Sequence, residues 1–462
     1  MVIPDGSDSY KNLTYDEDGF GVYEGKTFYQ PATQGADGVY QIANAGQLYW
    51  FAQSGGSSAS AVLTADITIQ TGVLNADGEL NGTPQYLWTP IGSYTGTFDG
   101  QGHTISGLYV DVSGSGDSDI YVYAGLFGYI NGGVVKDLSI TDSYISGSAS
   151  SNTLASAYVG GVCGKNNDGT IENCSVSATV TGSVTGSASD KYAYVGGVCG
   201  YNNGGTIENC YNSGSVTGSV TGNASDKYAN VGGVCGYNIG GTIMNCYNSG
   251  SVTGSASGKY AYVGGVCGQN YSYDSYDDGT ATITNCYNTG SVTGTGNAYF
   301  YVGGVCGYNY AYGSSTAKIT NCYSTGTVTS SDGTAYVGGV CGQNFANRGT
   351  AKITNCYSTG EVTSTGTYGG VCGTNDFSSG TATITNCYWL TGTASTGIGT
   401  GNGTATNVES KTVDEFASGE VAWLLNTYET GSVWAVGDNG YPVLRPDQVN
   451  KVVKLTVDNI AR

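Results

Sequence analysis

The sequence predicts an all-β fold, a right-handed parallel β-helix whose coils of about 36 residues stack into one solenoid with short helical caps at both ends. Two observations lead to this prediction. The stretch Tyr194–Ser219 recurs six more times with small changes, and a period of about 20–50 residues is typical of stacked-unit proteins. Within a repeat, the apolar residues form short β-branched clusters between glycine, asparagine and serine turns, without helical periodicity.

One coil is expected to contain three short strands and three turns. The apolar runs are Val195–Cys199, Ile207–Cys210 and the residues around Val216. Successive coils should pair at roughly 4.8 Å, and stacking should bury the apolar face that one coil cannot bury alone. Insertions fall between the two cysteines of a repeat, where the spacing grows from 11 to as many as 19 residues. We therefore expect the insertions to line up along one flank, as binding surfaces of solenoids often do.

The two cysteines of each repeat are predicted to point into the core. A divergent copy, Gly125–Ser139, aligns without a gap and places Phe127 and Leu138 at the two cysteine positions. Regular pairs of cysteines favour disulfides within coils, and two ladders of reduced thiols are the alternative. Metal binding is disfavoured because the chain has no C-x-x-C motif and one histidine. The predicted pairs are Cys163–Cys174, Cys199–Cys210, Cys235–Cys246, Cys267–Cys286, Cys306–Cys322, Cys341–Cys356 and Cys372–Cys387.

The repeats resemble the GLUG motif family of bacterial proteins. The resemblance is carried by Gly196–Asn202, Ile207–Tyr211, Gly214 and Val216 and by their copies, and it extends over roughly residues 36–446. It implies secreted or cell-surface proteins that are described as adhesin-like and share no catalytic residues. No secretion signal or membrane anchor is visible, and we expect both to lie outside this chain.

Composition excludes several classes of partner. The chain has 35 acidic and 15 basic residues among 462, a formal net charge of −20. This charge disfavours nucleic acid and anionic membrane surfaces. The absence of a run of about 18 apolar residues disfavours membrane insertion.

The chain is predicted to have five parts, two of which contain a capped helix. A helix over Asn44–Gln53 should cover the open N-terminal end of the solenoid, with Gln47 at the capping-box position. Thr412 and Glu415 form a second capping box, opening a helix to about Asn426. The parts are a non-repeating segment (1–35), an N-terminal cap with the first coils (36–119), the repeat solenoid (120–392), a C-terminal cap (393–450) in which Trp434 and Tyr441–Leu444 seal the distal end, and a tail (451–462) that begins a further domain.

Two sets of exposed side chains are candidates for binding. If the cysteines point inward, the residue after each second cysteine points outward, and the resulting tyrosine column could be a ligand platform or a stabilising ladder. The longest insertion, Asn270–Gly279, adds further tyrosines and three aspartates that could bind calcium or form a solvated loop. The ligand candidates are Tyr211, Tyr247, Tyr287, Tyr323, Tyr357, Tyr388, Tyr273 and Tyr276, and the calcium candidates are Asp274, Asp277 and Asp278.

Other polar patterns are interpreted as structural. Asp16–Gly19 is expected to be an acidic turn, and Asp99 with His103 a turn between strands. The asparagine before each second cysteine should serve turn hydrogen bonding. Pairs such as Thr179 and Thr181 recur on a flat face, as ice binding requires, but Glu361 interrupts this rank.

The predicted function is a non-catalytic, adhesin-like module outside the cell that presents loops and tyrosine columns to a host or matrix glycan or protein, or acts as a spacer. No cofactor is expected, apart from a possible role for calcium at the aspartate loop. The alternatives are a polysaccharide-degrading enzyme, which needs a carboxylate pair in a groove, and an ice-binding protein. Ligand identity and oligomeric state stay open.

Overall fold

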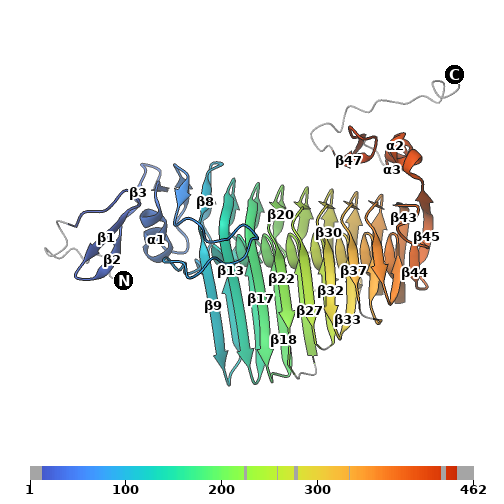
Figure 1. Ribbon diagram of the computed structural model, residues 1–462, viewed down its shortest axis with the longest axis horizontal. Coiled ribbons are helices and arrows are strands. Elements are labelled where there is room, and N and C mark those ends of the chain that lie inside the picture. The colour runs from blue at the N-terminus through green and yellow to red at the C-terminus, as the bar shows by residue number, and fades with distance from the viewer. Residues whose placement is uncertain are drawn as a thin grey trace.

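A computed structural model describes residues 13–222, 226–257, 259–274, 279–331, 333–427 and 433–444. The protein is a right-handed parallel β-helix of about nine coils, and helices make up 6% of the part that the structure describes. Figure 1 shows the coils stacked side by side along one axis, with the N-terminal elements at one end and the C-terminal helices beside the last coils. The predicted fold class is confirmed.

The N-terminal part begins with a hairpin and continues into the first coils. The parallel pairing that defines the solenoid starts at Tyr40. The predicted turn at Asp16 is present, and its carboxylate accepts a hydrogen bond from the N–H of Phe20 (2.8 Å). An isolated parallel bridge joins Ile91 to Phe127. The elements are β1 (Phe20–Tyr23), β2 (Lys26–Tyr29), β3 (Thr33–Gln34), β4 (Tyr40–Ile42), α1 (Ala45–Ser54), β5 (Ala61–Leu63), β6 (Ile67–Thr68), β7 (Thr97–Asp99), β8 (Thr104–Ser106) and β9 (Tyr109–Gly116).

Helix α1 covers the N-terminal end of the solenoid, as predicted (Figure 1). Its N-cap is Asn44, whose side chain accepts a hydrogen bond from the N–H of Gln47 (2.9 Å). The Gln47 side chain in turn accepts from the N–H of Ala43 (2.7 Å), one residue ahead of the cap. Leu48 and Phe51 are buried in the solenoid core. The apolar face of α1 therefore packs on the first coils and removes their end from water.

Each regular coil contains four strand positions, one more than predicted. The additional strand arises because the expected run Val195–Cys199 bends at Gly197. A Cβ at Gly197 would lie 2.2 Å from the carbonyl oxygen of Gly233 in the next coil, so only glycine allows this close approach. The first strands are β10 (Ile120–Ala124), β14 (Leu154–Gly160), β18 (Asp190–Gly196), β23 (Asp226–Gly232), β28 (Tyr260–Gly264), β33 (Tyr299–Gly303), β38 (Tyr336–Gly338) and β42 (Thr367–Gly369), which form one eight-stranded parallel sheet.

The other strand positions also stack in parallel and in register. The second strands are β11 (Phe127–Asn131), β15 (Cys163–Asn167), β19 (Cys199–Asn203), β24 (Cys235–Ile239), β29 (Cys267–Tyr273), β34 (Cys306–Tyr312), and the beginnings of β39 (Cys341–Thr354) and β43 (Cys372–Leu390). The third are β12 (Val134–Lys136), β16 (Thr170–Glu172), β20 (Thr206–Glu208), β25 (Thr242–Met244), β30 (Thr280–Thr284) and β35 (Thr316–Thr320). The fourth are β13 (Ser139–Ser151) and β17 (Ser175–Gly186), and then the split pairs β21 (Tyr211–Asn212) with β22 (Val216–Val220), β26 (Tyr247–Asn248) with β27 (Val252–Ala256), β31 (Tyr287–Asn288) with β32 (Val292–Gly296), β36 (Tyr323–Ser324) with β37 (Val328–Ser330), and β40 (Tyr357–Ser358) with β41 (Val362–Ser364).

All fourteen cysteines are buried, free thiols. Cys199 lies in register with Cys163 and Cys235 of the neighbouring coils, and the N–H of Cys210 lies 3.4 Å from the Sγ of Cys246. The inward direction of the sulfurs is confirmed. Within-coil disulfides are not formed, because each sulfur has the equivalent cysteine of the next coil as its neighbour. The prediction is therefore wrong for Cys163–Cys174, Cys199–Cys210, Cys235–Cys246, Cys267–Cys286, Cys306–Cys322, Cys341–Cys356 and Cys372–Cys387, and the alternative of two thiol ladders is the observed arrangement.

An asparagine ladder runs beside the thiol ladders inside the solenoid. The amide of Asn202 donates to the side-chain oxygen of Asn238 (2.8 Å) and to the carbonyl of Gly205 (2.8 Å). Each buried amide thus satisfies both a turn of its own coil and the next coil. Sequence analysis did not identify this ladder, whose members are Asn166, Asn202, Asn238, Asn270, Asn309, Asn344 and Asn375.

The insertions line up along one flank, as predicted. Between β29 and β30, and between the equivalent strands of the next coils, the chain extends the second and third strands outward in register. Alanines pack between the two layers of this extension. They form a small core of their own, made of Ala311, Ala317, Ala346, Ala351 and Ala382.

The C-terminal cap does not seal the distal end of the solenoid. It folds onto the outer side of the last coils, where Trp434 packs against the rings of Tyr323 and Tyr357. The Tyr357 hydroxyl donates to the carbonyl of Pro442 (2.6 Å). The predicted role of Trp434 and Tyr441–Leu444 as an end seal is therefore wrong. The elements of this part are β44 (Ile398–Thr400), β45 (Thr404–Lys411), α2 (Val413–Ala417), α3 (Glu420–Asn426), β46 (Trp434–Val436) and β47 (Pro442–Leu444), and residues 451–462 lie outside the described residues.

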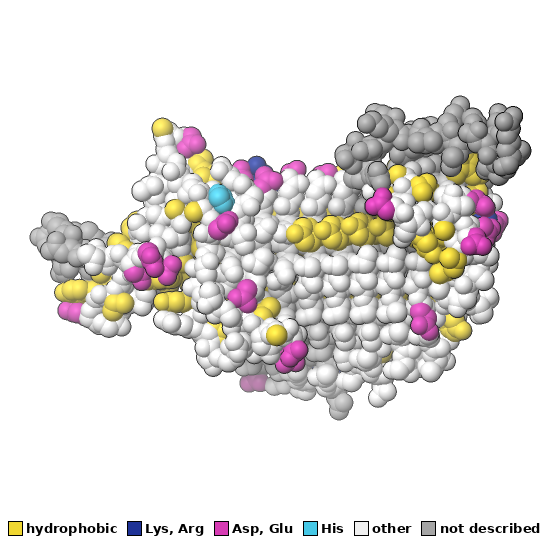
Figure 2. Space-filling view, turned by 45° about the horizontal axis from the view of Figure 1, so that its top comes forward, with side chains coloured by type: hydrophobic (Ala, Val, Ile, Leu, Met, Phe, Trp, Pro, Cys, Tyr) yellow, Lys and Arg dark blue, Asp and Glu magenta, His cyan; other side chains and the backbone are white. Residues whose placement is uncertain are grey.

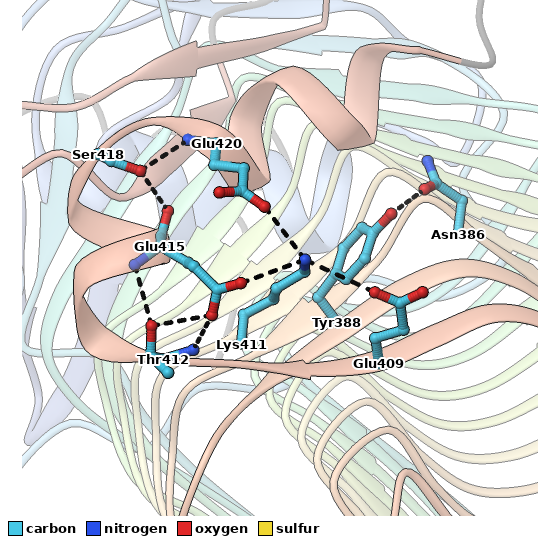
Figure 3. Close-up of polar contacts among 8 residues, drawn as sticks. All are labelled: Asn386, Tyr388, Glu409, Lys411, Thr412, Glu415, Ser418 and Glu420. Carbon is cyan, nitrogen blue, oxygen red and sulfur yellow. Dashed lines mark hydrogen bonds and ion pairs between the residues drawn. The ribbon is translucent and has the colours of Figure 1, made fainter. Parts of the chain in front are cut away.

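The predicted C-terminal helix is divided in two at Gly419, whose φ of 81° is left-handed. The predicted capping box of Thr412 and Glu415 is present in α2. Lys411 holds the two helices together: its ammonium lies 3.4 Å from Glu415 and 3.1 Å from Glu420, as Figure 3 shows. The same ammonium lies 5.9 Å from the ring of Tyr388, which anchors the cap on the tyrosine column.

Candidate ligand-binding groove

A concave corner runs along the solenoid between the first and second strands of each coil. Gly200 marks it, because a Cβ there would lie 2.8 Å from the carbonyl oxygen of Tyr194 in the same coil. The second strand therefore folds back against the outer side of the first strand. Outward-facing side chains from both strands converge, as the T-shaped contact between Tyr194 and Tyr201 shows (5.0 Å).

The corner is lined almost entirely by tyrosine. A cavity of about 520 Å³ lies in it, in the size range of ligand sites. Its lining contains no charged side chain. The lining residues are Tyr192, Tyr194, Tyr228, Asn230, Tyr237, Tyr260, Tyr262, Gln269, Tyr271, Tyr301, Tyr308 and Tyr310. One side of the corner carries the tyrosines that precede the glycine pair of each repeat, Tyr158, Tyr194, Tyr262, Tyr301 and Tyr336. The groove was not predicted, because the bend that brings this column toward the facing one was not predicted.

Stacking with neighbouring coils fixes the rings. Tyr158 and Tyr194 stack at 5.0 Å, and Tyr301 stacks on Tyr336 at 5.5 Å. Burial raises the pKa of Tyr194 and of Tyr308 well above the usual value for a phenol, with neighbouring phenols adding to the effect. The lining of the cavity therefore stays uncharged over the physiological pH range and presents ring surface and neutral hydroxyl groups. Outside the cavity, Lys165 lies in register with Tyr201 of the next coil, and its ammonium is 5.4 Å from the Tyr201 ring.

The predicted tyrosine column lies at the start of the fourth strands and is continuous. Tyr211, Tyr247 and Tyr287 stack at 4.8 Å with interplanar angles of 3°. Figure 2 shows a straight hydrophobic stripe that runs along this side of the solenoid to the C-terminal cap. Tyr211 is 36% exposed, whereas Tyr357 under the cap is 1% exposed. Half of the predicted platform, namely Tyr323, Tyr357 and Tyr388, is thus buried by the cap and is unavailable to a ligand.

The predicted loop candidates are only partly described. Tyr273 stacks on Tyr312 at 5.4 Å in the flanking extension. Asp274 is exposed at the end of the second strand. Tyr276, Asp277 and Asp278 lie outside the described residues. Within the described ranges, no three histidine, cysteine, aspartate or glutamate side chains are grouped so as to hold a metal ion.

The residues interpreted as structural are engaged in the fold. Asp99 pairs with Lys136 (2.8 Å), and His103 Nδ1 lies 3.1 Å from the carboxylate of Asp66. The asparagine before each second cysteine has a left-handed φ of 51–54° and bonds to its counterpart in the adjacent coil, as in Asn209 to Asn173 (3.0 Å). The predicted turn role of these asparagines is confirmed.

The flat rank of hydroxyl side chains is also present on the fourth strands, with Thr217 and Thr253 in register. The Thr179 hydroxyl donates to the carbonyl of Gly78, so the loop around Gly78 covers one end of the rank. Glu361 is exposed within the rank at the other end. Both features reduce the regular area that an ice surface would need.

In the part of the chain that the structure describes, no helix is both long and apolar enough to cross a lipid bilayer. Comparison with curated proteins finds no match. Among solved structures, a crystal structure titled as a "putative immunoglobulin A1 protease" from Bacteroides ovatus aligns with 19% identity over 94% of this chain and 99% of that chain, with a TM-score of 0.35.

The family comparison agrees with the repeats. The model of the GLUG motif matches residues 155–181, 192–217, 228–253, 260–293, 298–329 and 333–363. These matches fall on six successive coils, each from the first strand to the fourth. Residues 155–363 therefore contain six copies of the GLUG motif.

Proposed function

We propose that the protein is a non-catalytic, adhesin-like module, secreted or held at a bacterial surface, and that its groove binds a neutral carbohydrate chain. The observation that carries this proposal is the uncharged lining of tyrosine, asparagine and glutamine along a concave corner. The location outside the cell follows from the resemblance of the repeats to those of secreted and surface proteins. The net charge of −20 favours a ligand without acidic groups.

Carbohydrate fits the groove better than other neutral polymers. A pyranose has an apolar C–H face that packs on aromatic rings and equatorial hydroxyl groups that hydrogen-bond at its edge. Tyrosine supplies both surfaces at once, because its ring is apolar and its hydroxyl is polar. The amides of Asn230 and Gln269 add both donors and acceptors. The stacked rings are also fixed before binding, which lowers the entropic cost of association.

We propose binding without turnover because no carboxylate lies among the residues that line the groove cavity. Hydrolysis of a glycosidic bond uses two carboxyl groups that flank the bond, about 5–9.5 Å apart. The groove lining has no carboxyl group. Asp99 and Asp137 lie elsewhere, and both are paired with Lys136, at 2.8 and 3.1 Å. The same rigid solenoid would also hold flanking parts of the protein away from a surface.

An array of neutral polysaccharides, acidic polysaccharides and matrix proteins tests the proposal. We expect the whole chain to be retained by at least one neutral polysaccharide. The double variant Tyr301→Ala with Tyr308→Ala should lose tenfold or more in affinity, which corresponds to about 1.4 kcal/mol. Tyr211→Ala, on the opposite tyrosine column, is the control and should bind like the wild type. Circular dichroism would verify that both variants fold.

Two results would contradict the proposal. Retention by a matrix protein alone, unchanged in the groove variant, would place binding on another surface. Release of reducing ends from the bound polysaccharide would show turnover and so make the protein an enzyme.

A further inference from the structure

Two gaps in the aromatic columns lie next to each other at one junction inside the cavity. The first-strand column has Tyr194, Asn230 and Tyr262 in three successive coils. The second-strand column has Tyr237, Gln269 and Tyr308 in register. Over these coils each column therefore lacks one ring, and the two gaps lie in adjacent coils. The second-strand column has further gaps outside the cavity, at Lys165 and Gln343.

The column rings on each side of this junction stack on the facing column, and two longer contacts cross the junction, Tyr237 with Tyr271 (6.1 Å) and Tyr228 with Tyr262 (6.3 Å). Tyr237 stacks on Tyr194 of the preceding coil (5.5 Å, 25°). Tyr308 stacks on Tyr262 of the preceding coil (5.1 Å, 13°). Between these two ring pairs lie Asn230 and Gln269, and all six side chains line the same cavity. Within the cavity, this junction is where Tyr237 and Tyr262 each have a face without a stacked neighbour from their own column.

Asn230 adds an independent sign of a ligand. It is 2% exposed, and its side-chain oxygen accepts no hydrogen bond from any described residue. A buried amide oxygen without a donor is disfavoured in a folded protein. Tyrosine occupies the equivalent position in the coils on both sides, so the repeat itself does not require an asparagine here.

We propose that this junction is a subsite for one pyranose ring of a neutral glycan, flanked by the Tyr194–Tyr237 and Tyr262–Tyr308 pairs, with a sugar hydroxyl donating to the Asn230 side-chain oxygen. This assignment rests on the proposed function and specifies where along the groove recognition occurs. The hydroxyl supplies the donor that Asn230 lacks. Gln269, partly exposed at the same junction, offers its amide to a neighbouring hydroxyl.

The lining also defines the class of sugar. With no cation among the lining residues, the subsite has nothing to neutralise a uronic acid or sulfate group. A cavity of about 520 Å³ exceeds one pyranose, so the flanking sugars of an extended chain would follow the groove along the neighbouring tyrosines. The subsite is therefore internal to a chain rather than a pocket for a terminal residue.

Calorimetric titration of the whole chain with cellohexaose, maltohexaose, xylohexaose and mannohexaose tests the subsite, with a proline-rich peptide as a comparison. Asn230→Tyr inserts the residue of the neighbouring coils, and Asn230→Leu removes the acceptor at similar size. Both should lower the affinity for the hexaose that the wild type binds by tenfold or more. Tyr247→Asn makes a gap in the other tyrosine column, outside the groove, and should bind like the wild type.

Melting temperature gives a readout that needs no ligand. Asn230→Tyr should raise the melting temperature of the free protein, because it completes the ladder and removes an unpaired buried oxygen. A lowered melting temperature would show that Asn230 is a structural residue and would overturn the subsite.

The outcomes separate the two proposals. If the wild type binds a hexaose and both Asn230 variants bind equally well, the subsite is wrong and the groove proposal stands. If the wild type binds no neutral sugar, both proposals fail. If it binds only the proline-rich peptide and Asn230→Tyr abolishes that binding, the junction is a peptide site and the assignment to sugar is wrong.

Discussion

At the residue scale, asparagine is used at two positions of each coil for different physical reasons. Asn209 adopts a left-handed backbone at the corner before the second cysteine, whereas Asn202 lies inside and bonds a turn carbonyl. The first use could be predicted, because asparagine tolerates this conformation at turns. The second use could not be predicted, because asparagine is polar and the alternation of residues along a strand does not show that this polar side chain points into the core.

Asn209 provides a test of the corner. Its φ is 51°. Its side-chain nitrogen donates to the side-chain oxygen of Asn173, and its side-chain oxygen accepts from the side-chain nitrogen of Asn245. Asn209→Ala should be less stable than Asn209→Gly by about 1–2 kcal/mol, since both lose the ladder bonds but only alanine is strained at positive φ. Urea denaturation of both variants measures the difference. Equal stabilities would show that the corner relaxes to another conformation.

The thiol ladders make a second prediction at this scale. Burial raises the pKa of the Cys163 thiol well above its usual value, which suppresses the reactive thiolate. We expect the native protein to resist alkylation, and the unfolded protein to take up fourteen labels without prior reduction. The melting temperature should be the same with and without reductant. Recovery of peptides linked between the two cysteines of one coil would instead support the disulfides that the sequence favours.

At the element scale, the position of the C-terminal cap illustrates a limit of sequence reasoning. The capping box of Thr412 and Glu415 was predicted from adjacent residues and is present. The surface on which the cap docks was not predicted, because positions 323 and 357 have the same residue type, tyrosine, as the exposed position 211. A repeat gives each coil the same outward side chains, so the sequence does not show which coils a following element covers.

The cap should detach without unfolding the solenoid. Trp434 is 4% exposed and packs on Tyr323 and Tyr357, whereas Trp423 is 52% exposed on the same cap. Trp434→Ala should weaken cap docking by about 3–5 kcal/mol, the usual cost of truncating a buried large side chain. Hydrogen exchange should then become faster in α2 and α3 but not in the thiol ladders.

Trp423→Ala is the matched control for this prediction and should leave the exchange rates unchanged. Faster exchange throughout the coils in Trp434→Ala would contradict the view of the cap as an appended unit. It would indicate instead that the cap and the solenoid unfold cooperatively.

At the scale of the whole molecule, periodicity accounts for what could be predicted. Equivalent residues stack in register, so one correctly interpreted repeat gives the direction of every cysteine and of the tyrosine after it. The sequence did not predict how residues at different positions of the same coil approach one another in space. The bend at Gly197 turns one expected strand into two, and it thereby creates the groove that faces Tyr194 toward Tyr201.

Modularity leads to a final prediction that joins the fold to the proposed subsite. Each coil contacts its neighbours, so removal of one whole period should leave a shorter solenoid that still folds. Deletion of residues 161–196 and deletion of residues 197–232 each remove 36 residues between equivalent glycines. The first places Tyr158 where Tyr194 lies now and keeps Asn230. The second removes Asn230 and brings Tyr194 next to Tyr262.

Both deletions should melt cooperatively and show the same β-sheet circular dichroism. Only the second should lose affinity for the neutral hexaose, by tenfold or more, because it restores an unbroken column of rings across the junction. The pair controls for length, coil number and loss of one interface. Equal binding by both shortened proteins would mean that recognition depends on the tyrosine groove as a whole, and equal loss would mean that it requires the length of the solenoid.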